Sequence, residues 1–141
     1  MAYSTKTDIL EQLDEAILVQ LTDDESTGLV NDDRVTRAIA SADAAIDSYC
    51  QGRFTVPLSP IPDKIRDVSV DLAIYNLYSR REDTTPETRK DRYKEGIRFL
   101  EKVAEGKINL GAATPAPATT GNAVDVEQSE RIFTRDKMSG F

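Results

Sequence analysis

The residues of this chain that could do chemistry are aspartates spaced four apart. Asp43 and Asp47 form one pair, and Asp63, Asp67 and Asp71 form a series. Residues four apart share one face of a helix, so their carboxylates could hold magnesium, as in a metal-dependent all-α nucleotide pyrophosphohydrolase. Such sites use longer, Glu-rich pairs, and no Lys or Arg here is placed distinctively for a phosphate. Hydrolysis is therefore kept only as an alternative function. We expect all of these aspartates except Asp71 to be solvated.

Histidine and cysteine usage excludes most other catalytic sites. The chain has no histidine and a single cysteine, Cys50. Zinc clusters, Ser-His-Asp triads and Cys-His pairs all need residues that it lacks, and one cysteine cannot form an internal disulfide. We expect a protein that is not an enzyme and that binds neither a metal nor another cofactor.

A polar break at residues 22–28 invites a calcium interpretation. If Gly28 stood at the sixth position of an EF-hand loop, Arg34 would stand at the twelfth, where the loop requires a bidentate carboxylate. An arginine there would repel the cation. The sequence therefore predicts an ordinary turn.

Apolar residues at helical spacing predict an all-α fold, a compact bundle of about four to five helices. The expected caps are Thr7, Asn31 and Thr85, and Gly52 and Gly106 end two of the helices. The expected elements are one bent or two short helices over 7–21, a helix over 31–51, a proline-rich extended connector over 53–62, a central helix over 62–81 and a last helix from Pro86 to Gly106.

Length and composition predict one compact domain followed by a tail. The chain has 141 residues, 39% of them hydrophobic and 30% charged, and no apolar stretch approaches the roughly 18 residues of a membrane span. We assign residues 1–110 to a helical domain, 111–129 to a flexible linker rich in Ala, Thr and Pro, and 130–141 to a docking peptide. Its candidate anchors are Ile132, Phe133, Met138 and Phe141.

Charge is divided unevenly along the chain. The net charge is −7, residues 1–52 carry eleven acids against three bases, and residues 53–110 carry ten acids against twelve bases. Nucleic-acid binding needs clustered cations, whereas copies packed head to tail could bring opposite charges together. We expect the basic segment to dock on the acidic segment of a neighbouring copy through Arg80, Arg81, Arg89, Lys90 and Arg92.

One ion pair is expected within the fold. Asp71 is surrounded by apolar residues of the central helix, so it needs a cationic partner. Arg53 begins the connector that returns over this helix. We therefore predict a structural pair between Asp71 and Arg53.

The order of these segments resembles a family of small helical neck proteins of Mu-like phages and prophages. The resemblance covers nearly the whole chain. It is carried by Ala2-Tyr3-Ser4, Leu21-Thr22-Asp23, Ala42 through Tyr49, Arg53-Phe54-Thr55-Val56-Pro57-Leu58, Asp71 through Arg81, Tyr93-Lys94, Gly106-Lys107-Ile108-Asn109-Leu110 and Phe133 through Met138.

This resemblance implies a head-tail connector, or adaptor. Its copies would form a ring beneath the portal in the virion neck, assembled in the host bacterial cytoplasm. The implied partners are further copies, the portal protein and head-closure or tail proteins, with DNA passing through the channel without specific binding and no membrane involved. Besides the hydrolase, a monomeric helical regulator of host proteins is a second alternative.

Overall fold

The computed structural model describes residues 2–81 and 85–111, and within these ranges the chain forms five α-helices and no strand. The all-α prediction is confirmed. The helices are α1 (Lys6–Gln12), α2 (Glu15–Thr22), α3 (Asp32–Cys50), α4 (Asp63–Ser79) and α5 (Glu87–Ala104). No helix in the described ranges is long and apolar enough to cross a membrane. Apart from Gly111, the predicted linker and the docking peptide, with Ile132, Phe133, Met138 and Phe141, lie outside the described residues.

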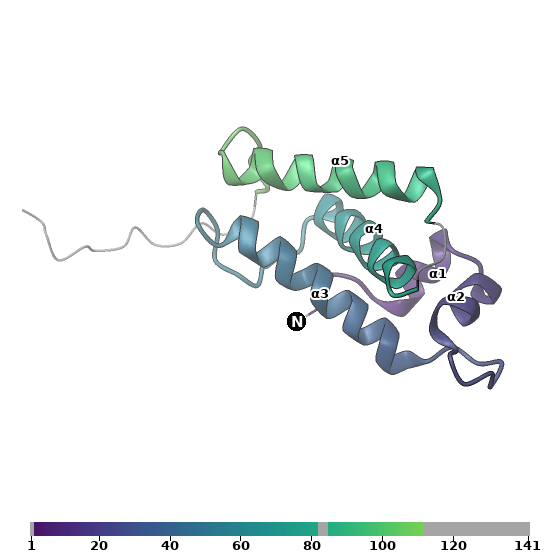
Figure 1. Ribbon diagram of the computed structural model, residues 1–141. Helices are drawn as coiled ribbons and strands as arrows, with labels where there is room; N and C mark the ends of the chain where they lie inside the picture. Colours follow the sequence, from purple (N-terminus) through teal and green to yellow (C-terminus); the bar gives the residue numbers. More distant parts are fainter. Residues whose placement is uncertain (1, 82–84, 112–141) are drawn as a thin grey trace, which may run out of the picture.

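Helix α4 is the centre of the bundle. Figure 1 shows it between α3 and α5, with α1 and α2 together at one end. Its buried side chains point in several directions around the helix axis, as the sequence predicted for a helix with neighbours on most sides. Those buried are Ile65, Val68, Ser69, Val70, Leu72, Ala73, Ile74 and Leu77.

The first helix begins two residues earlier than predicted, because Thr5 and not Thr7 is its cap. The Thr5 hydroxyl accepts from the Asp8 amide at 3.3 Å, and the Asp8 carboxylate accepts from the Thr5 amide at 2.8 Å. This reciprocal capping box needs an acid or its amide three residues after the cap. The predicted helical region over 7–21 is two helices, with the break at Leu13 and Asp14.

The later boundaries follow the sequence closely. Asn31 caps α3, as predicted, by accepting from the Arg34 amide at 3.2 Å. Pro86 is the residue before the first helical position of α5, so the prediction that Thr85 caps this helix was wrong by one residue.

Gly106 ends α5 in the predicted way. Its φ of +80° favours glycine, and the amides of Gly106 and Lys107 donate to the carbonyls of Val103 and Lys102 at 3.0 and 2.9 Å. These two bonds form a Schellman motif, which satisfies carbonyls that the end of a helix leaves without partners. The chain thereby turns at the end of α5 and runs back past Arg53 and Phe54.

Candidate subunit-docking surface

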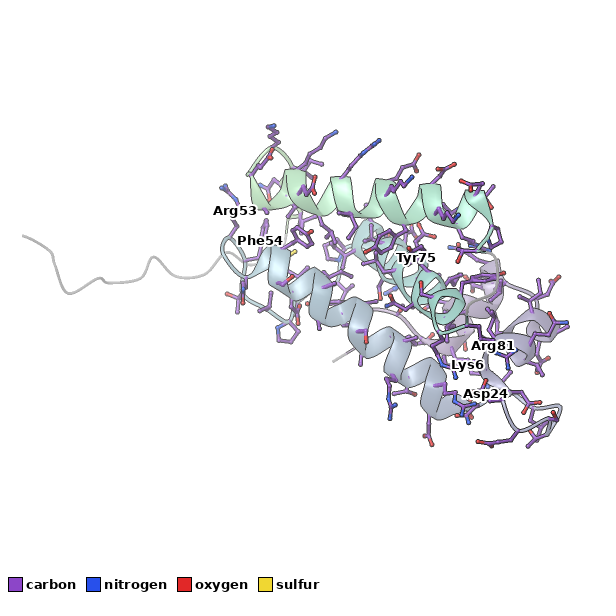
Figure 2. All side chains as sticks on the ribbon, in the orientation of Figure 1. Lys6, Asp24, Arg53, Phe54, Tyr75 and Arg81 are labelled. Carbon is purple, nitrogen blue, oxygen red and sulfur yellow. The ribbon has the colours of Figure 1, made fainter. Side chains whose placement is uncertain are left out.

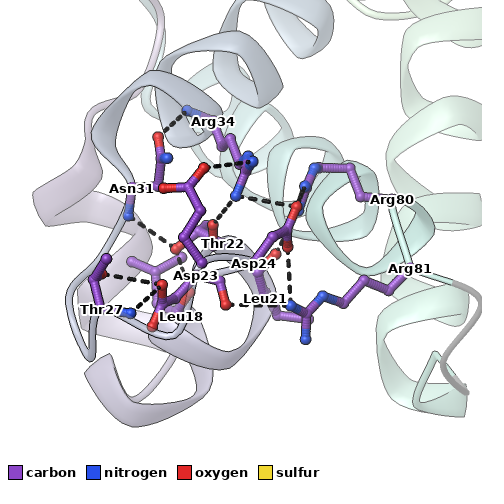
Figure 3. A network of polar contacts seen from close by, with 11 residues as sticks. Leu18, Leu21, Thr22, Asp23, Asp24, Thr27, Asn31, Arg34, Arg80 and Arg81 are labelled. Carbon is purple, nitrogen blue, oxygen red and sulfur yellow. Dashed lines mark hydrogen bonds and ion pairs between the residues drawn. The ribbon is translucent and has the colours of Figure 1, made fainter.

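Asp24 contacts three arginines at one end of the bundle, one in α3 and two directly after α4. Its Oδ2 lies 2.6 Å from Arg80 Nη2 and 3.0 Å from Arg34 Nη1, and its Oδ1 lies 2.9 Å from Arg81 Nη2 (Figure 3). Hydrogen bonds from Arg81, and to a lesser extent from Arg80, favour the charged form of this carboxyl and hold its pKa below the usual range. The contacts join the loop after α2 to the start of α3 and the end of α4.

Two of the same arginines also complete the end of α2. Arg80 Nη1 donates to the Leu21 carbonyl at 2.7 Å, and Arg34 Nη1 donates to the Thr22 carbonyl at 2.6 Å (Figure 3). Carbonyls at the end of a helix lack intrahelical partners, and the helix dipole favours cations there. Arg80 and Arg81, predicted to contact a neighbouring copy, therefore close a loop of their own chain.

Asp23 shapes that loop from inside. Its carboxylate accepts from the Thr27 amide at 2.9 Å, the Thr27 hydroxyl at 3.0 Å and the Gly28 amide at 2.7 Å. The two backbone donors lower the pKa of Asp23. Ser26 and Gly28 take left-handed conformations with φ of 58° and 75°. The segment is the ordinary turn that the sequence predicted, because the Asp23 carboxylate accepts hydrogen bonds from the backbone of the loop.

Asp71 does not pair with Arg53, contrary to the prediction. Its Oδ1 lies 3.7 Å from Arg92 Nη1, whereas the Arg53 guanidinium packs against Gly106. Figure 2 shows Arg53 and Phe54 at the end of the bundle opposite Asp24 and Arg81. The prediction was wrong because the connector starts beside the last turn of α5, while Asp71 faces the first half of that helix.

The cations around Asp71 hold α5 on α1. Arg89 Nη2 donates to the Gln12 carbonyl and Arg92 Nη1 donates to Gln12 Oε1, both at 2.8 Å. The Asp71 side chain is 19% exposed, and burial raises its pKa, an effect that Arg92 and then Arg89 oppose. Lys90 pairs with Glu87 on the same helix at 3.2 Å. All five predicted docking cations thus have partners within one copy.

The aspartate pair on α3 fixes the N-terminal segment. Asp43 Oδ2 accepts from the Tyr3 amide at 3.3 Å and its Oδ1 accepts from the Ser69 hydroxyl at 3.0 Å, while the Tyr3 hydroxyl donates to Asp47. Burial raises the pKa of Asp43, and the Ser69 hydroxyl counteracts this. We had expected Asp43 to be solvated, and it is buried. A helical sequence pattern could not show that an N-terminal tyrosine folds back over α3.

The other aspartates offer no assembled metal site. Asp63 and Asp67 are exposed on α4, as predicted. Within residues 2–81 and 85–111, no group of three or more Asp, Glu, Cys or His side chains is placed to hold a metal ion. Cys50 is fully buried, and burial raises the pKa of its thiol to about 11, which leaves it in the unreactive thiol form.

A groove of about 320 Å³ lies between α3 and α5, and no pattern in the sequence pointed to it. Tyr93 and Ile97 pack against the core from α5, and Tyr49 lies across from them on α3. All three are partly exposed. Tyr93 stacks on Tyr75 of α4 with ring centroids 4.0 Å apart, which fixes one wall. Lys94, Arg98 and Glu101 form the polar lining.

Comparison with known proteins places this helical body in a phage lineage. Residues 3–128 match the family described as Bacteriophage Mu, Gp36. The chain is 29% identical over 140 residues to the Mu-like prophage FluMu protein gp36 of Haemophilus influenzae, covering 99% of this chain and 97% of that protein. It is 30% identical over 144 residues to Gene product J of Escherichia phage Mu, covering 100% of this chain and 99% of that protein. The chain therefore belongs to the bacteriophage Mu Gp36 family.

Proposed function

We propose that this chain is a structural head-tail connector, or adaptor, of a tailed phage or prophage. The observation that carries the proposal is its membership of the Mu Gp36 family along nearly its whole length. In this proposal several copies form a ring beneath the portal, in the virion neck. The portal protein would lie on one side of the ring, and head-closure or tail proteins on the other.

The use of charged groups within the body supports a structural role. Asp24, Asp43 and Asp71 face arginines, hydroxyls or backbone amides of their own chain. Such contacts stiffen a small helical body and leave no cluster of acids directed at a shared ligand in the described residues. A rigid subunit suits a ring that must keep its shape while DNA passes through it.

The overall charge suits a channel for DNA. A net charge of −7 makes the average surface repel phosphates, so DNA passing through a ring of such subunits would meet few attractive contacts. Copies in a closed ring meet through two different surfaces, one on each neighbour. We include in the proposal that residues 130–141 reach a neighbouring subunit or the next ring.

The experiment is deletion of the gene from a phage that carries it, with complementation by the intact chain. We expect filled heads and separate tails after deletion, and joined particles after complementation, as seen by electron microscopy of lysates. Joined, infectious particles in the deletion strain would contradict a connector role. Magnesium-dependent hydrolysis of nucleoside triphosphates by the purified chain would instead favour the hydrolase alternative.

A further inference from the structure

Leu29 is unusual because it is a large apolar side chain held out in water. It is 71% exposed, and it is the one large hydrophobic residue so exposed among residues 2–81 and 85–111. It stands in the loop between α2 and α3, next to Gly28. A single exposed leucine needs no explanation by itself. The structure of the loop that carries Leu29 does suggest a reason for its exposure.

The loop that carries Leu29 is fixed from both sides. Asp23 binds the backbone of Thr27 and Gly28 from within, and the Leu29 amide donates to the Thr27 hydroxyl at 3.3 Å. Asp24 ties the same loop to Arg80 and Arg81 at the end of α4 (Figure 3). A side chain on a preorganised loop loses little conformational entropy on binding, which is the property of a good interface anchor.

The groove between α3 and α5 has the complementary features. Tyr49, Tyr93 and Ile97 offer a partly exposed apolar wall, and Lys94 and Arg98 line it with positive charge. Neither cation has an ion pair or a hydrogen bond within the described parts of the chain, unlike the five cations predicted for docking. Glu101 is the one acid in the lining.

Exposed acids flank Leu29. Glu25 precedes it, and Asp32 and Asp33 follow it in the first turn of α3, whereas Asp23 and Asp24 bind loop amides and arginines of their own chain. An apolar anchor with acidic neighbours fits an apolar groove with a basic lining, and such complementarity selects both partner and orientation.

The anchor and the groove cannot meet within one copy. Leu29 lies just before the first residue of α3, and Tyr49 lies in its last turn. At 1.5 Å per residue the two ends of this helix are about 25 Å apart. Figure 1 shows the loop before α3 at one end of the bundle, and the last turns of α3 and α5 together at the other. A contact between them must join two copies head to tail.

We propose that Leu29 of one copy inserts into the groove formed by Tyr49, Tyr93 and Ile97 of the next copy. This inference rests on the proposed ring and specifies the surfaces through which it closes. It also replaces Arg80 and Arg81 by Lys94 and Arg98 as the cations that face the acidic neighbour.

Cross-linking between two variants that each carry one introduced cysteine tests the contact directly. Copies with Leu29→Cys are mixed with copies with Ile97→Cys and treated with a short bismaleimide. Cys50 is fully buried and does not compete. We expect a heterodimeric adduct in the mixture and little adduct from either variant alone. The matched control replaces Ile97→Cys by Glu95→Cys, because Glu95 is exposed on α5 outside the groove lining.

A second measurement compares assembly of the full-length chain by sedimentation velocity. We expect Leu29→Asp to weaken self-association by at least about tenfold, as loss of a central anchor does, while Leu29→Met assembles like the wild type. Because Leu29 is 71% exposed, both variants should retain the wild-type circular dichroism spectrum.

The outcomes separate this contact from the proposed function. Suppose that wild-type rings are present in particles, that Leu29→Asp assembles normally, and that Ile97→Cys and Glu95→Cys give equal amounts of adduct with Leu29→Cys. The contact is then wrong, and the connector role stands. If joined particles form without the protein, the connector role fails whatever the adducts show. A wild-type chain that stays monomeric at its highest soluble concentration and gives no selective adduct also overturns the contact.

Discussion

Arg80 Nη2 lies 2.6 Å from Asp24 Oδ2, although 55 residues separate the two along the chain. The pair brings the acidic first part of the sequence and its basic second part together within one copy. Charge asymmetry along the sequence therefore does not translate directly into two opposite faces of the molecule. Lys94 and Arg98, which line the groove beside α3, have no ion pair or hydrogen bond within the described residues and stay available for a neighbour.

Replacing Asp24 by alanine should loosen the loop that carries Leu29. Three arginines lose a common acceptor, so we expect faster amide hydrogen exchange in residues 24–30 and only a slight fall in melting temperature, since these charges are near water. Asp33→Ala is the control, because Asp33 is exposed on the first turn of α3. Unchanged exchange in this loop would show that the arginines do not hold it.

Arg92→Ala should destabilise the fold in a pH-dependent way. Burial raises the pKa of Asp71, and loss of Arg92 raises it further, so ionised Asp71 becomes more costly near pH 7. We expect a loss of about 1 kcal/mol at pH 7, kept small because Arg92 is half exposed. The loss should shrink as pH falls through the raised pKa, since protonated Asp71 needs no partner.

Urea unfolding of four chains checks this coupling. The wild type, Arg92→Ala, Asp71→Asn and the double variant form a cycle that separates the charge contact from the bond between Arg92 and Gln12. In the Asp71→Asn background, Arg92→Ala should have the same effect at every pH. If Arg92→Ala lowers the stability of the chain with Asp71 intact by the same amount at low pH, the lost contact with Gln12 accounts for the effect.

Gly106→Ala should cost about 1 to 2 kcal/mol, the usual penalty for a side chain in the left-handed region. The backbone has φ of +80°, and a Cβ would lie 2.5 Å from the Arg53 guanidinium, which can move aside. The control is Gly52→Ala, because no atom lies within 4 Å of its added Cβ and its φ is ordinary. Equal unfolding midpoints for the two variants would contradict a special role for Gly106.

Reversing the charges of Lys94 and Arg98 to glutamate should weaken self-association and reduce its dependence on salt. Exposed charge contacts across an interface are screened as ionic strength rises, so wild-type association should fall with added salt. Lys102→Glu with Lys90→Glu changes the net charge equally outside the groove. If that control weakens assembly as much, net charge and not the groove governs association.

The sequence predicted the long helices because their apolar spacing and their terminal residues agree. Asn31 before α3 and Gly106 after α5 are local signals, since each acts on backbone groups within a few residues. The partner of Asp71 was not predictable in this way. It depends on how α5 lies over α4, and the choice between Arg53 and Arg92 is made by packing of distant segments.

The same limit explains what was missed in the candidate site. Tyr93 and Ile97 have the spacing of core residues, and both are partly exposed in the groove between α3 and α5. In the sequence Asp24 is one acid of a polar turn, because two of its three arginines, Arg80 and Arg81, stand more than fifty residues later. Leu29, by contrast, could have been noticed as a lone leucine between a glycine turn and a helix cap.

Removing residues 128–141 should leave the helical body folded and abolish assembly. The buried core of the described residues runs from Tyr3 to Val103, so we expect unchanged helicity and an unchanged unfolding midpoint. The deleted segment contains Ile132, Phe133, Met138 and Phe141, which an extended peptide could bury on a partner. A full-length chain with serine at these four positions separates loss of the anchors from loss of chain length. Unfolding of the truncated protein would show that the tail belongs to its own core, and normal particles from it would exclude a docking role.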